Sequence, residues 1–122
     1  LVIDRLAEEP GSREAGQALF DRFCQDMDHN LREMGIGDLS VPKEMERIGQ
    51  AFYGRAQAYR SALAADGEGA LVEALTRNIY EGSPPTPEAP GHLAGYVREA
   101  VRDVRAQLVG DLLAGKLHLP KP

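Results

Sequence analysis

Several features that are common in proteins are scarce or missing in this sequence, and each absence narrows its class. Cys24 is the only cysteine, so no disulfide can form within the chain and no cysteine pair can bind a metal. No apolar run approaches the ~20 residues that span a bilayer, and no signal-peptide pattern opens the chain. The 14 Lys and Arg are outnumbered by 19 Asp and Glu, a net charge of −5 that argues against nucleic acid as the main partner.

Helical periodicity is what the sequence has in abundance. Apolar residues recur at helical spacing almost everywhere, and no segment alternates for long enough to predict a strand. The sequence therefore predicts an all-α fold, a single compact helical bundle of about five helices. With 122 residues and 43% hydrophobic residues, we expect one domain spanning residues 1–122. The chain starts without Met in what reads as the middle of a helix, so we expect this first helix to be truncated.

Glycine, proline and serine set the expected helix boundaries. Pro10 and Gly11 stop the first helix, and Ser12 is a suitable N-cap for the next one. Gly82 to Pro90 holds four prolines and is expected to be an extended connection. The helices expected after Ser12 are residues 12–34, 42–64, 70–80 and 91–113.

The apolar stripe of the first long helix is expected to face the core, and it comprises Leu19, Phe20, Phe23, Cys24, Met27, Leu31 and Met34. Asn30 falls inside this arc and Asn78 lies on the apolar side of a later helix, so each amide needs a partner. We expect both to join a structural network with Gly35, Gly37 and Tyr59. Contact of the two amides with a substrate is the alternative.

The titratable residues give little support to catalysis or metal binding. His29, His92 and His118 lack the spacing of a metal site, and we expect neither metal nor cofactor. Cys24 lies within the apolar stripe, where burial raises the pKa of a thiol, so core filling is favoured over a nucleophile.

The segment around Gly35-Ile36-Gly37 holds the one candidate for an active site. Arg32, Glu33 and Asp38 are a candidate acid–base or anion-binding set, although a structural network that links loop and helices is favoured. The glycines do not form a phosphate loop, because no strand precedes them and no Lys-Ser/Thr pair follows.

The literal sequence of this region resembles one family. The run Leu31-Arg-Glu-Met-Gly-Ile-Gly-Asp-Leu39, followed by Val41-Pro-Lys43 and the Ala51-Phe-Tyr-Gly-Arg55 block, is similar to the ubiquinol-cytochrome c chaperones. The resemblance covers roughly Leu19 to Leu113. It implies a non-enzymatic chaperone that binds newly made cytochrome b and assists assembly of the bc complex. It also implies a further N-terminal part of the family domain and, in mitochondria, a small partner protein and the ribosome as neighbours.

Partner contacts are expected on the second long helix. Tyr and Arg dominate interface hot spots, and a glycine between them admits a close helix, so Tyr53, Gly54 and Arg55 are candidate partner-binding residues. Arg32 and Asp38 are added to this set. Packing within the fold is the alternative for all five.

Two further function classes stay open on the sequence alone. A helical dimerisation or scaffold module would suit the same composition, as would, less well, a small enzyme that uses Arg32, Glu33 and Asp38. A cleft in which these three side chains converge would favour the enzyme, whereas an exposed apolar surface would favour binding. The expected location is the cytoplasm, with peripheral association at the inner membrane, or the matrix side in a eukaryote.

Overall fold

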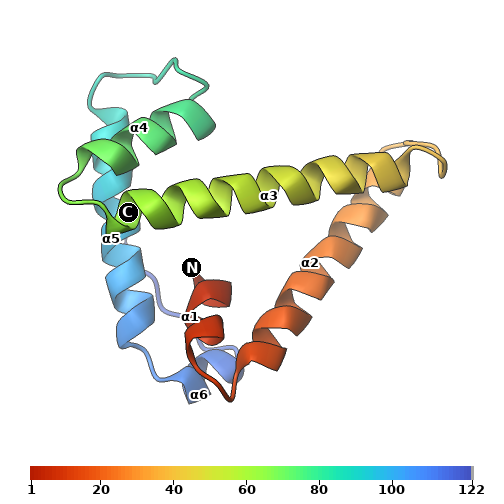
Figure 1. Ribbon diagram of the computed structural model, residues 1–122, viewed down its shortest axis with the longest axis horizontal. Coiled ribbons are helices and arrows are strands. Elements are labelled where there is room, and N and C mark those ends of the chain that lie inside the picture. The colour runs from red at the N-terminus through yellow and green to blue at the C-terminus, as the bar shows by residue number, and fades with distance from the viewer. Residues whose placement is uncertain (122) are drawn as a thin grey trace. The chain divides into compact units, whose positions relative to one another are not determined.

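The computed structural model describes residues 1–121, which are all-α and confirm the predicted fold class (Figure 1). Within this range there are six helices and no strand: α1 (Val2–Glu8), α2 (Arg13–Glu33), α3 (Val41–Ala64), α4 (Gly69–Asn78), α5 (Ala89–Ala106) and α6 (Val109–Leu113). The chain divides into two compact units. The first comprises Leu1–Gln50 and Val104–His118, and the second comprises Ala51–Asp103 and the residues from Leu119 on.

Several helix boundaries lie at or next to the serine and proline residues that predicted them. α2 begins directly after Ser12 and ends at Glu33, within a residue of each predicted boundary. α3 begins at Val41, so Pro42 lies in the first turn, where its missing N–H leaves no hydrogen bond unmade. α5 begins earlier than expected, at Ala89, for the same reason: Pro90 fits a first turn as well as it fits an extended segment.

The last long helix is interrupted, and the prediction of one helix from Gly91 to Leu113 is wrong. α5 ends at Ala106, and Leu108 has extended backbone angles (φ −65°, ψ 133°) before α6 begins. The side-chain Nε2 of Gln107 donates to the His118 backbone carbonyl (2.7 Å), and the side-chain Oε1 of Gln107 accepts the His118 backbone N–H (2.9 Å). Leu108 is 74% exposed at this break, so its side chain does not pack in the core.

The core of the second unit is built from small side chains and leucines. Its buried members are Ala62, Leu71, Ala74, Leu75 and Ala94, and the half-buried Tyr59, Leu63, Val72, Leu93 and Val97 pack against them. The three alanines allow the backbones of α3, α4 and α5 to approach closely. Tyr59 thus packs on the core, and its hydroxyl oxygen is buried without a hydrogen-bond partner among the described residues.

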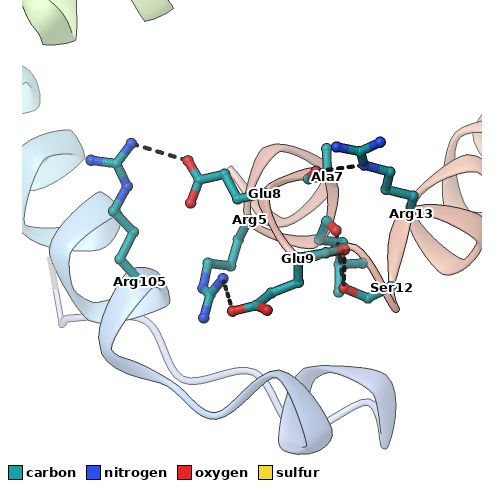
Figure 2. Close-up of polar contacts among 8 residues, drawn as sticks. Arg5, Ala7, Glu8, Glu9, Ser12, Arg13 and Arg105 are labelled. Atoms are coloured by element: carbon teal, nitrogen blue, oxygen red, sulfur yellow. Dashed lines mark hydrogen bonds and ion pairs between the residues drawn. The ribbon is translucent and has the colours of Figure 1, made fainter.

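In the first unit, α1 and α2 meet at a sharp corner held by one buried hydroxyl (Figures 1 and 2). Ser12 is 2% exposed and occupies the N-cap position, but its hydroxyl makes no cap bond to α2. It donates instead to the carbonyl oxygens of Leu6 (3.0 Å) and Glu9 (3.3 Å) at the end of α1. Gly16 brings the helices together, since a Cβ there would lie 3.4 Å from Leu6 Cβ.

Further polar contacts surround this corner (Figure 2). Arg13 Nε donates to the Ala7 carbonyl (3.3 Å), and Arg5 pairs with Glu9 (3.2 Å). Glu8 and Arg105 pair at 3.3 Å and join α1 to the end of α5. The Glu8–Arg105 pair is solvent-exposed, and such a pair contributes less than ~1 kcal/mol.

The apolar stripe of α2 is less buried than predicted. Leu19 is 44% exposed and Met34 77% exposed, and the members between them (Phe20, Phe23, Cys24, Met27 and Leu31) are half-buried. α1 has 7 residues, about 10 Å of helix, against 21 residues and about 31 Å for α2. Within the first unit, α1 therefore covers only the beginning of α2. No helix in residues 1–121 has both the length and the apolar character needed to cross a membrane.

We expect Ser12→Ala to lower the free energy of unfolding by ~1–2 kcal/mol, because the buried Leu6 carbonyl loses its hydroxyl donor, while the Glu9 carbonyl keeps the backbone N–H of residue 12 (3.1 Å). Urea denaturation followed by circular dichroism measures the change. Ser83→Ala, at an exposed loop position, should stay within ~0.5 kcal/mol of the unmodified protein. Equal effects of the two substitutions would contradict this role of Ser12.

Candidate partner-binding surface

The loop between α2 and α3 (Met34–Ser40) has a well-defined backbone. Gly35 adopts φ 83°, a left-handed conformation that favours glycine, and its N–H donates to the Arg32 carbonyl (3.0 Å). The Ile36 N–H donates to the Leu31 carbonyl (3.1 Å), which closes the end of α2. Gly37 has no positive φ; its carbonyl accepts the N–H of Ser40 (2.7 Å) and starts the turn into α3.

Arg32 fastens this loop to α2 through a fork of hydrogen bonds. Its Nε donates to Asp28 Oδ2 at 2.7 Å and its second terminal nitrogen to Asp28 Oδ1 at 3.3 Å, a two-point contact along the helix. Its remaining terminal nitrogen donates to Asp38 Oδ1 in the loop. The structure therefore brings the predicted residues Arg32 and Asp38 together. Asp28 was not predicted, although its i,i+4 spacing from Arg32 is a recognisable signal.

The same contacts shift two pKa values in opposite directions. The hydrogen bond from Arg32, with its positive charge, lowers the pKa of Asp28 from its ordinary value. The hydrogen bond and the charge of Asp28, helped by Asp38, raise the pKa of Arg32. Both residues stay charged across the physiological range, so this cluster holds a fixed salt bridge and offers no proton donor or acceptor near neutral pH.

The candidate catalytic set does not assemble. Glu33 directs its carboxylate to His29 Nε2 (3.1 Å), while Arg32 engages Asp28 and Asp38. Glu33 and Asp38 are also strongly exposed, at 65% and 86% of their side chains. Among the described residues no cluster of three His, Cys, Asp or Glu side chains is arranged to hold a metal ion.

Tyr53, Gly54 and Arg55 lie at the surface of α3 within the second unit. Tyr53 is 59% exposed, and its ring stands edge-on to Phe52 with centroids 5.7 Å apart and an interplanar angle of 86°. A Cβ at Gly54 would meet nothing within 4 Å, so the described residues leave this glycine open to a partner. Successive residues of a helix are 100° apart, so Tyr53 and Arg55 project from different sides of α3.

Asn30 and Asn78 do not make the side-chain contacts that we expected from the sequence. Asn30 is exposed, and the prediction that its amide is enclosed in an apolar face is wrong, because the described covering of α2 by α1 stops well before it. Asn78 donates to the Ala74 carbonyl of its own helix (2.9 Å), which replaces the loop contact that we expected.

A hollow of about 500 Å³ lies at the C-terminal end of α4, and it contains none of the predicted site residues. Its lining is Glu73, Thr76, Arg77, Glu81 and Gly82. Glu81 and Gly82 both have positive φ, 51° and 81°, where the chain leaves α4. The glycine was a recognisable signal for this turn, but the left-handed glutamate was not.

Comparisons with known proteins agree on one family. The family model described as ubiquinol-cytochrome C chaperone matches residues 1–119. The crystal structure of the Cbp3 homolog from Brucella abortus is 38% identical in sequence and superposes with a TM-score of 0.82 over 98% of this chain. The chain spans 66% of that protein, slightly less than two thirds. No curated protein matches the chain.

Arg32→Ala should loosen the loop without unfolding the protein, since the ion pairs that it removes are exposed. Hydrogen–deuterium exchange at the amides of Ser40 and Val41 should become faster. Arg22→Ala is the matched control, because Arg22 pairs with Asp26 (3.0 Å) on the same helix without reaching the loop. Unchanged exchange in the Arg32 variant would refute the fastening role.

The lowered pKa of Asp28 predicts a pH-dependent contribution to stability. The carboxylate is favoured in the folded state, so its contribution is complete above the unfolded pKa of ~3.9 and is lost as the pH falls through the lower folded pKa. The Tm difference between the unmodified protein and Asp28→Asn should therefore be largest near neutral pH and shrink below pH ~4. A difference that does not change with pH would contradict this assignment.

Proposed function

The chain belongs to the ubiquinol-cytochrome c chaperone family, and on this premise we propose that it is a non-enzymatic assembly chaperone of the bc complex whose client is newly made cytochrome b. Membership of this family supports a role in the assembly of the ubiquinol-cytochrome c reductase. Cytochrome b is the client that the resemblance implies. Because the chain spans only part of its structural relative, the proposal concerns the binding that residues 1–122 contribute.

One observation carries the proposal: on α3 an exposed tyrosine lies next to a glycine that the described residues leave open. Tyr53 projects into solvent beside an open glycine, and an aromatic ring next to a small residue fits a helix that approaches closely. The client is a membrane protein, and its transmembrane helices offer surfaces of this kind. Of the candidate catalytic set, Arg32 and Asp38 pair with each other, whereas Glu33 pairs with His29, so the three side chains do not converge, which is consistent with a non-enzymatic role.

The remaining parts of the proposal concern organisation and location. Residues 1–122 act as one functional domain, which the single family match over 1–119 supports. The protein works in the cytoplasm, or on the matrix side in a eukaryote, where it associates peripherally with the membrane that receives the client. A small partner protein and the ribosome are further partners that the family suggests for mitochondrial members.

We expect Tyr53→Ala combined with Arg55→Ala to weaken capture of cytochrome b, because the client loses an aromatic anchor on one side of α3 and a cation on another. Capture is measured by binding newly synthesised cytochrome b to the immobilised protein. The thermal melt by circular dichroism should shift little, since Tyr53, Gly54 and Arg55 are exposed.

The control is Glu99→Ala combined with Arg102→Ala, two exposed residues of α5 that should leave capture unchanged. If the Tyr53 and Arg55 variant captured cytochrome b as well as the unmodified protein, these residues would not belong to the binding surface. Self-association that disappears in the same variant, with no capture by the unmodified protein, would favour the dimerisation module instead.

A further inference from the structure

The α2–α3 loop exposes two large apolar side chains. Leu39 is 98% exposed and Met34 is 77% exposed, the two highest values among the large hydrophobic residues that the structure describes. A single exposed apolar side chain is ordinary on a protein surface. Two of them lie within the seven residues between α2 and α3, so this loop is our candidate for a contact surface.

The loop is held in position before any partner arrives. Val41, two residues after Leu39, is fully buried and anchors the start of α3. The fork of Arg32 to Asp28 and Asp38 joins the other side of the loop to α2. Because the backbone is already ordered, docking of Leu39 would cost less conformational entropy than docking of a mobile segment.

The polar groups of the loop are largely occupied within the protein. Asp38 and Asp28 neutralise the guanidinium of Arg32, and the N–H groups of Gly35, Ile36 and Ser40 donate to main-chain carbonyls. What the loop offers to a partner is therefore chiefly apolar area. Arg32 and Asp38, which we predicted as partner contacts, serve on this reading as positioning residues.

The charge around the loop selects between apolar partners. Residues 28–43 contain three acidic and two basic side chains, a net charge of −1 with histidine neutral. Segments that lie on a lipid surface are rich in Lys and Arg, because the cytoplasmic leaflet is anionic. The loop lacks that excess, so an apolar protein segment suits it better than a bilayer.

We propose that Leu39 and Met34 form a docking tip for an apolar helix of the client membrane protein. The inference rests on the proposed chaperone function and adds the residues and the chemistry of one contact. Burial of one leucine side chain on binding corresponds to about a tenfold change in affinity.

The test uses the full chain and a labelled helical peptide of about 20 Leu and Ala residues with uncharged flanks, kept soluble in dodecyl maltoside. Fluorescence anisotropy measures its affinity. Leu39→Ser should weaken binding about tenfold, and Met34→Ser should weaken it by a smaller factor. Leu108→Ser is the matched control, because Leu108 is 74% exposed at a different place in the first unit; it should leave affinity within about twofold.

Three outcomes would overturn the proposal. The first is equal affinity of the Leu39→Ser variant and the unmodified protein, or an equal loss in the Leu108→Ser variant. The second is flotation with phosphatidylcholine or phosphatidylglycerol vesicles that depends on Leu39 while peptide binding does not. The third is a dimer in sedimentation velocity that Leu39→Ser dissociates, since the tip would then serve a second copy of the chain.

The peptide probe also separates this inference from the proposed function. Normal capture of cytochrome b by the Leu39→Ser variant, together with unchanged peptide binding, would reject the docking tip and leave the chaperone function standing. Failure of the unmodified protein to capture cytochrome b would reject the chaperone function, whatever the peptide result.

Discussion

Close approach of helices through small side chains is the constraint on which the rest of this structure depends. In the second unit, Ala62, Ala74 and Ala94 let three helices share one small core. In the first unit, Gly16 brings α2 against Leu6 of α1, and the Ser12 hydroxyl donates a buried hydrogen bond to the Leu6 carbonyl at the corner. Cores built this way enclose few large side chains, so many of the leucines and aromatic rings remain at or near the surface.

That distribution suits a protein that binds apolar partners. Tyr53 on α3 and Leu39 in the α2–α3 loop are both exposed, and each is carried by an ordered part of the chain. They offer different chemistry: an aromatic ring beside an open glycine at one place, and an aliphatic side chain on a fastened loop at the other. A chaperone that holds a membrane protein before assembly needs apolar contacts of modest area, because it must later release its client.

Local signals in the sequence were enough to predict most helix boundaries and part of the site. Pro10 and Ser12 predicted the start of α2, and Gly35 predicted its end, because each residue constrains the backbone conformation at its own position. The break at Leu108 was not predictable, since the contact of Gln107 with His118 spans 11 residues and leaves no periodic signal. The role of Ser12 was missed for a similar reason: the same residue type caps its own helix or, as here, the preceding one.

The most direct test of the central claim is affinity isolation of the full-length protein from membranes of its own source organism, with the bound proteins identified by mass spectrometry. The chaperone account predicts strong enrichment of cytochrome b over other abundant membrane proteins. Good recovery of the bait without cytochrome b or any other subunit of the bc complex would contradict it.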